Sequence, residues 1–188
     1  MRFPCVAALG LVVVTGCSVG EGEGEVRGTV TAPACGLRDR AYDLQPDFFG
    51  AEHVLGRLSI RIQRGSDFED KSDGLVLLVD DVARVHAQAL GRPMSLDDPR
   101  TPVRMSLYLN ETCHPSRGRT PVGMVAVGGT IEFGGIYLPG GGDEELETAG
   151  RFDAVRLVDP AAPESTHAEL SGHFRFPYRR GRPAQRFP

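Results

Sequence analysis

The chain has 188 residues, with 21 basic and 25 acidic side chains and a formal net charge of −4. Its 24 glycines follow no three-residue period, which excludes a collagen-like helix, and no heptad repeat runs through the chain, which excludes a coiled coil. An apolar content of 40% at this modest charge argues against wholesale disorder. One globular domain is therefore the expected architecture.

The N-terminus has the layout of an export signal. A short positive start, Met1-Arg2, precedes an apolar run from Val6 to Val14, and small residues at 15 and 16 precede Cys17. The run is shorter than the roughly 20 apolar residues that a transmembrane helix needs. The sequence thus predicts a processed signal segment rather than a retained anchor helix.

The segment Val14-Thr15-Gly16-Cys17 resembles the lipobox of bacterial lipoproteins. The resemblance covers only residues 1–18, and an ordinary secretory signal is the alternative. It implies that residues 1–16 are removed as a signal peptide and that Cys17 carries acyl chains such as palmitate. A serine after the cysteine, here Ser18, implies the outer membrane of a diderm cell envelope.

Glycine alternates with glutamate in the segment SVGEGEGE, from Ser18 to Glu25. Such a segment is typical of a solvated linker, since like charges keep it extended. Residues 17–25 are therefore predicted to be a lipidated cysteine followed by an acidic tether, with a reach of at most about 28 Å at ~3.5 Å per residue. The folded domain is expected to span residues 26–188.

Short β-prone runs separated by Gly, Pro and Asp clusters occupy this domain. The expected strands are 28–31, 58–63, 75–79, 103–109, 122–138, 152–158 and 170–178. Glycine pairs at 128–129 and 134–135 indicate bulges or corners within a strand. Residues 81–90 have helical spacing and predict one short helix. The pattern predicts an all-β fold, an antiparallel β-sandwich or jelly roll of about eight strands.

Cys35 and Cys113 are the two mature cysteines other than Cys17. An oxidising envelope compartment favours a disulfide between them. In the loop-entropy model, closing about 78 residues contributes ~4.5 kcal/mol. The alternatives are a reactive thiol or a metal site, but two cysteines without CxxC spacing are poor zinc ligands.

An acidic loop is the weak candidate for a cofactor, a calcium ion. Its carboxylates are Asp67, Glu69, Asp70 and Asp73. The loop fails the EF-hand template, because Lys71 falls at a ligand position. A solvated turn is the alternative interpretation, and no firm metal site is predicted.

No catalytic motif is present. The histidines at 53, 86, 114, 167 and 173 lack metal-ligand spacing, and no serine has a supporting nucleophile motif. A Ser-His-Asp arrangement assembled from distant positions stays open, since such triads are recognised by geometry and not by sequence order. The expectation is a protein that is not an enzyme.

The C-terminus forms a basic tail on an acidic body. Residues 179–188 contain Arg179, Arg180, Arg182 and Arg186 and no acidic side chain. These arginines are candidates for binding an anionic partner such as lipopolysaccharide, or for lying across the acidic body of the same chain. Nucleic acid is not expected as a partner at a sequence pI near 5.7.

The leading hypothesis is a non-catalytic, lipid-anchored cell-envelope protein with a structural or interaction role. It would meet the membrane through its N-terminal lipid and contact an envelope protein, a glycan or lipopolysaccharide. A calcium- or glycan-binding module and an envelope hydrolase with an unrecognised site are the alternatives. The sequence directs attention to the loops at the ends of the sheet and to the basic tail.

Overall fold

In the part of the chain that the structure describes, the fold is one antiparallel sheet of ten strands with a single α-helix. A computed structural model describes residues 20–65, 72–140 and 147–178. The strand order is β2-β1-β10-β9-β8-β7-β5-β4-β3, and the short β6 pairs with β8. The strands are β1 (Glu23–Ala32), β2 (Leu37–Leu44), β3 (Phe48–Val54), β4 (Arg57–Gln63), β5 (Asp73–Val79), β6 (Met94–Ser95), β7 (Val103–Leu109), β8 (Val122–Gly135), β9 (Glu147–Val158) and β10 (His167–Pro177).

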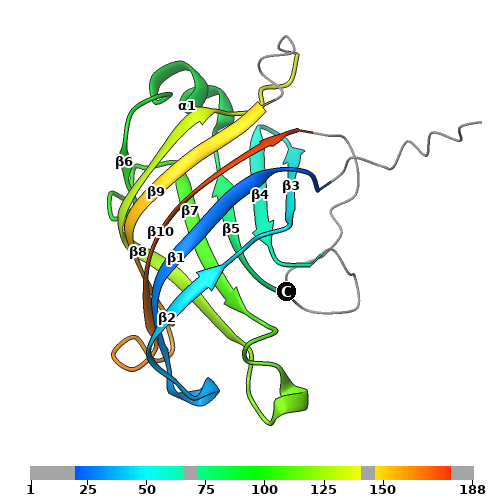
Figure 1. Ribbon diagram of the computed structural model, residues 1–188. Helices are drawn as coiled ribbons and strands as arrows, with labels where there is room; N and C mark the ends of the chain where they lie inside the picture. Colours follow the sequence, from blue (N-terminus) through cyan, green and yellow to red (C-terminus); the bar gives the residue numbers. More distant parts are fainter. Residues whose placement is uncertain (1–19, 66–71, 141–146, 179–188) are drawn as a thin grey trace, which may run out of the picture.

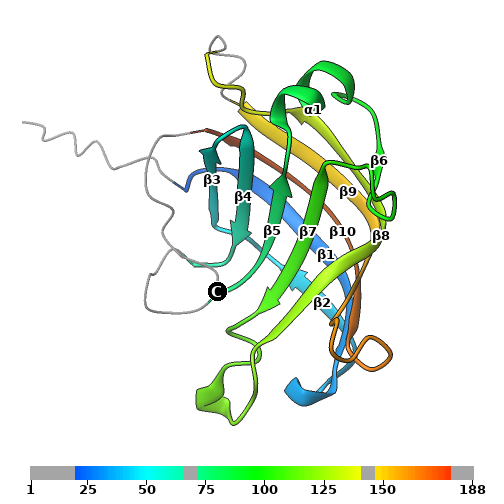
Figure 2. The same cartoon turned by 180° about the vertical axis from the view of Figure 1, so that it is seen from behind.

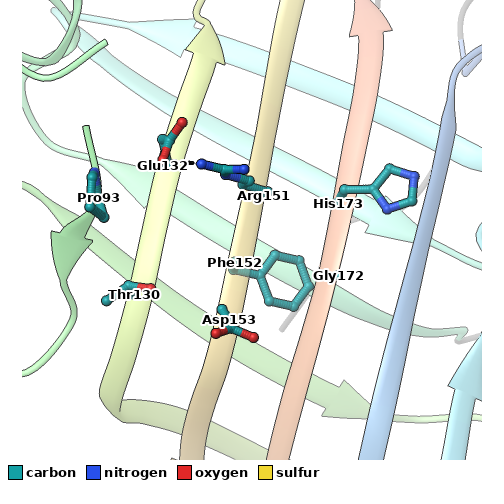
Figure 3. A pocket seen from close by; sticks show the side chains of 8 residues that line it. All are labelled: Pro93, Thr130, Glu132, Arg151, Phe152, Asp153, Gly172 and His173. Carbon is teal, nitrogen blue, oxygen red and sulfur yellow. Dashed lines mark hydrogen bonds and ion pairs between the residues drawn. The ribbon is translucent and has the colours of Figure 1, made fainter. Parts of the chain in front are cut away.

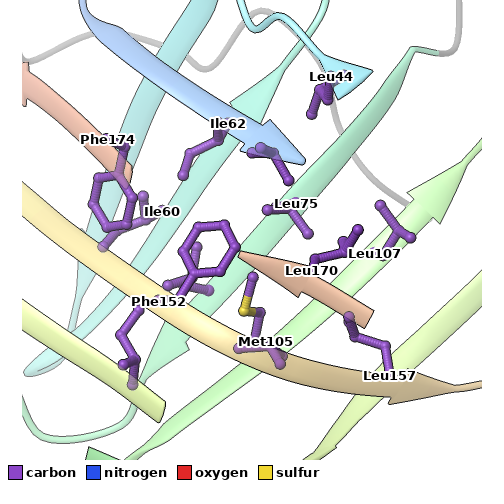
Figure 4. Packing of buried hydrophobic residues seen from close by; sticks show 14 of the residues in the cluster. Leu44, Ile60, Ile62, Leu75, Met105, Leu107, Phe152, Leu157, Leu170 and Phe174 are labelled. Carbon is purple, nitrogen blue, oxygen red and sulfur yellow. The ribbon is translucent and has the colours of Figure 1, made fainter. Parts of the chain in front are cut away.

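The sheet curls until its two halves face each other. Figure 1 shows β9, β10, β1 and β2 on one side of the molecule, and Figure 2 shows β3, β4, β5 and β7 on the other. Apolar side chains from both halves fill the space between them, for example Phe174 and Leu170 opposite Ile60 and Leu75 (Figure 4). The predicted antiparallel all-β fold is confirmed, and its two layers are halves of one continuous sheet.

Bulges in adjacent strands produce much of this curvature. The register of β8 against β9 shifts at Gly128, Gly129 and again before Gly135. Gly129 has a φ of 94°, and a Cβ there would lie 2.5 Å from the Cα of Val155 on β9. Only glycine fits this conformation and this close approach. The bulges predicted from the glycine pairs are therefore confirmed.

The one helix, α1 (Val82–Gln88), lies inside the range predicted for it. The side chain of Asp81 caps its start by accepting a hydrogen bond of 2.9 Å from the backbone N–H of Arg84. Val82 and Val85 are buried, so the helix covers one end of the apolar interior (Figure 1).

The curled sheet meets itself along a line that we call the seam, where β3 lies against the segment Gly20–Glu23 and the end of β10. The backbone N–H of Phe49 on β3 donates a 3.0 Å hydrogen bond to the carbonyl of Gly20. The ring of Phe49 also packs against that of Phe176 on β10, with centroids 6.1 Å apart. One backbone bridge and an aromatic contact thus join β3 to β10 and to the segment before β1.

The tether predicted for residues 17–25 is wrong in its C-terminal part. Glu23–Glu25 pair with β10, with Glu23 opposite Arg175, and Gly20 pairs with β3. A Cβ at Gly22 or Gly24 would meet the ring of Phe49, and Glu21 and Glu23 are exposed. The Gly-Glu alternation is the two-residue period of a strand whose inner side has no room for side chains. Within the predicted tether, only Cys17, Ser18 and Val19 lie outside the described residues.

The predicted disulfide between Cys35 and Cys113 is present, with a Cα–Cα distance of 5.2 Å. Cys35 belongs to a short 3-10 helix (Pro33–Cys35) between β1 and β2, and Cys113 follows β7. Both cysteines are buried. The bridge therefore fastens one half of the curled sheet to the other.

Candidate functional site

Two hollows along the described strands of the sheet bring titratable side chains together. The first, the sheet-face pocket, has a volume of about 580 Å³ and lies on the outer face of β8, β9 and β10 (Figure 3). Register aligns three of its polar residues across these strands, with Glu132 opposite Arg151 and Arg151 opposite His173. The Arg151 guanidinium donates to the Glu132 carboxylate at 2.8 Å. This pair is a cross-strand ion pair of the kind that stabilises a sheet surface.

Asp153 and His173 line this pocket, and Ser171 precedes the lining residue Gly172, but these three described residues do not form a catalytic relay. The Ser171 hydroxyl donates to Asp153 at 2.9 Å and accepts from the backbone N–H of Ala154, also at 2.9 Å. Ala154 has a φ of 47° at the bulge, so this hydroxyl satisfies an amide that the ladder leaves unpaired. The ring of His173 extends toward β1, away from Asp153 (Figure 3). Ser171 therefore has a structural role.

The second hollow, the Tyr42 pocket, has a volume of about 400 Å³ and lies between β2 and the ends of β4, β5 and β7. Apolar side chains and charged groups of both signs line it. Its lining includes Val30, Leu37, Leu44, Arg40, Arg64, Asp43, Asp73 and Glu111. The mixture of an apolar surface with a few polar groups is typical of a small-molecule site.

The hydroxyl of Tyr42 is the exceptional group in this pocket. It is buried and has no hydrogen-bond partner among the described residues. Burial raises the pKa of Tyr42 well above its usual value, and the charges of Asp73 and Glu111 raise it further. The phenol is therefore a protonated donor close to carboxylates, and a buried donor without an acceptor costs free energy.

Asp73 holds the turn that follows β7. Its carboxylate accepts hydrogen bonds from the backbone N–H groups of Glu111 at 3.0 Å and Thr112 at 3.1 Å, and from the Thr112 hydroxyl. Burial raises the pKa of Asp73, whereas these hydrogen bonds lower it. Of the four calcium candidates, Asp67, Glu69 and Asp70 lie outside the described residues, and Asp73 already uses its oxygens within the protein.

Other site candidates from the sequence also fall outside the structure's description. These candidates are Cys17 and the arginines Arg179, Arg180, Arg182 and Arg186. In residues 20–65, 72–140 and 147–178, no three His, Cys, Asp or Glu side chains gather as a metal site. The same part of the chain contains no helix with the length and apolar composition that a membrane span requires.

Sequence reasoning missed both hollows. Tyr42 lies in a strand with the sequence LRDRAYDL, in which no apolar alternation marks the half-buried ring. Comparison with known proteins adds nothing to either site, because no protein-family model, no curated protein and no solved structure matches the chain.

Proposed function

We propose that the chain is a non-catalytic, lipid-anchored protein of a bacterial cell envelope, with its β domain held at the membrane as a structural or interaction module. The observation that carries the proposal is the buried Cys35–Cys113 disulfide. Structural disulfides persist in exported proteins and are rare in the cytosol. A disulfide in the folded domain agrees with the export signal and the lipobox cysteine, Cys17.

The roles of the polar groups support a non-catalytic protein. The Ser171 hydroxyl completes a β-bulge, and the Asp73 carboxylate holds the turn after β7. Glu132 and Arg151 neutralise each other on the sheet surface. These contacts favour the interaction hypothesis over the hydrolase alternative, because they assign the candidate catalytic groups to the fold itself.

Export and lipidation are tested together by expressing the full chain in a diderm bacterium and fractionating the cells. The parent chain should sediment with membranes, and globomycin, which blocks lipoprotein signal cleavage, should cause the unprocessed form to accumulate. Cys17→Ser should abolish the lipid-dependent fractionation. A parent chain that is soluble and unaffected by globomycin would contradict the proposal.

A second candidate function, glycan binding, is favoured by the unpartnered hydroxyl of Tyr42. When the side chains that cover this donor move aside, a hydroxyl-rich ligand can accept a hydrogen bond from it and exchange others with the charged rim, while the ligand's carbon skeleton covers the apolar lining. Calcium is less favoured there, because Asp73 is already occupied by three donors.

Glycan binding is tested by titrating the folded domain with muropeptides and with the core oligosaccharide of lipopolysaccharide. A ligand bound in the Tyr42 pocket should raise the melting temperature by mass action, and Tyr42→Phe should reduce that shift. Shifts that are absent, or equal in both proteins, would remove the support for this second function.

A further inference from the structure

Three features that suit contact with a lipid bilayer lie along the seam. The first is the N-terminus, since Gly20 pairs with Phe49 near the start of β3. Cys17 precedes Gly20 by three residues, a reach of at most about 10 Å. An acyl group on Cys17 would therefore hold the bilayer directly against this part of the domain.

The second feature is the tip of the hairpin formed by β3 and β4. Leu55 is 96% exposed and its neighbour Val54 is 53% exposed. Leu55 has a φ of 51° and Gly56 a φ of 82°, which together make the two-residue turn that normally favours Asn-Gly. A leucine in this conformation carries strain, and an exposed apolar pair at a strained tip points to a contact outside the domain.

The third feature is the exit of the basic tail. The ring of His53, near the hairpin tip, makes an edge contact with Tyr137, at a centroid distance of 5.8 Å. Tyr137 in turn stacks on Tyr178 at 3.5 Å. Tyr178 is the last described residue before the tail, so the arginine-rich segment 179–188 begins close to the same hairpin.

β3 thus connects the three features. Its start lies beside the N-terminal entry, its end lies beside the exit of the tail, and Leu55 lies six residues beyond Phe49, about 20 Å along the strand. Figure 1 shows β3, the start of β1 and the end of β10 on the same side of the molecule. The tail carries four arginines and no acidic side chain.

We infer that the seam faces the bilayer, with the apolar tip Val54-Leu55 inserted at the headgroup boundary and the arginines of the tail, which starts after Tyr178, attracting anionic lipid headgroups. This inference rests on the proposed lipidation of Cys17 and adds an orientation to it. A single anchor point leaves a domain free to turn, whereas a second apolar contact and a basic segment define one face toward the membrane.

The experiment uses the full lipidated chain with Leu55→Cys, labelled with an environment-sensitive fluorophore. Because Cys35 and Cys113 are bridged and Cys17 is acylated, the new thiol is the intended site of labelling. The labelled protein is placed in vesicles of phosphatidylethanolamine and phosphatidylglycerol that contain a nitroxide lipid quencher. The matched control is Glu164→Cys in the loop between β9 and β10, at the opposite end of the molecule (orange in Figure 1).

Quenching should be strong at residue 55 and absent at residue 164. The intact mass of the protein shows whether it is lipidated. If it is lipidated but quenching is equal at both positions, or absent at residue 55, the proposed orientation is wrong and the proposed anchor stands. An unmodified mass would overturn the anchor, and this inference with it.

A second variant separates membrane contact from folding. With the label at Val54→Cys, the additional change Leu55→Asn should keep or raise the melting temperature, because asparagine suits the left-handed turn position. The same change should reduce quenching at residue 54, since the apolar tip is lost. Unchanged quenching with Leu55→Asn would overturn the role assigned to the tip.

Discussion

Gly22 lies against the ring of Phe49, so closely that a Cβ at residue 22 would be 2.7 Å from two of the ring carbons. The Cβ of Phe176 would be 2.8 Å away on the other side. The seam can close only because this position has no side chain. Gly22→Ala should therefore destabilise the domain by about 1–3 kcal/mol, the usual cost of overpacking.

Urea unfolding of the two proteins measures this difference in the free energy of unfolding. Gly134→Ala is the matched control, because a Cβ there meets no heavy atom within 4 Å and its backbone needs no left-handed φ. We expect the control to remain within about 0.5 kcal/mol of the parent. Equal stability of the two variants would show that the segment 20–25 does not pack as described.

Reduction of the Cys35–Cys113 bridge should destabilise the domain. The sequence separation of 78 residues gives a loop-closure contribution of up to ~4.5 kcal/mol. The double variant Cys35→Ala with Cys113→Ala should show the same loss and no further effect of reductant. Reactivity of both thiols in the folded, non-reduced protein would contradict the bridge.

Tyr42→Phe should leave stability unchanged at neutral pH or raise it by about 1 kcal/mol, because the lost hydroxyl is a buried donor without a described partner. A loss of more than about 1 kcal/mol would instead show that an ordered water or another group satisfies the hydroxyl.

The raised pKa of Tyr42 also predicts how alkali acts on the fold. The folded chain keeps the phenolic proton above pH ~10, where the unfolded chain loses it. The contribution of Tyr42 to the free energy of unfolding is fully present below pH ~10 and is lost as the pH rises through the folded pKa. In an absorbance titration, the ionisation that the Tyr42→Phe variant lacks should occur above the usual pH of a tyrosine, and its occurrence at the usual pH would contradict the burial.

Asp73 predicts a gain in stability at low pH. Burial raises its pKa, so the folded chain binds more protons than the unfolded chain between pH ~3.9 and the folded value. The stability due to this group should rise as the pH falls through that window. The comparison is with Asp73→Asn, which retains an acceptor for the backbone N–H groups. The parent should gain stability relative to the variant on acidification, and a relative loss would show that Asp73 is instead held ionised.

The sequence predicted those elements correctly in which the local residue pattern alone determines the structure. The helix from Val82 follows from helical spacing with Asp81 as its cap, and β7 has the bounds that its apolar residues predicted. The alternating face of Phe174 and Phe176 is buried as expected. In each case the local pattern and the tertiary packing agree.

The sequence misled, or was silent, where tertiary contacts decided the outcome. The Gly-Glu alternation has the composition of a linker, and the aromatic rings that require glycine there come from β3 and β10, far away in the chain. The edge strand β2 has mostly exposed residues on both faces, so it carries no apolar period. The environment of Tyr42 depends on Asp73 and Glu111, which are brought to it only by the curl of the sheet.

The central claim is that Cys17 carries lipid and holds this β domain at a membrane. The most direct measurement is the intact mass of the chain purified from the membrane fraction. We predict a mature chain that begins at Cys17 and carries a diacylglyceryl group and an amide-linked acyl chain, with the Cys17→Ser variant lacking both. An unacylated mass for the parent chain would contradict the account.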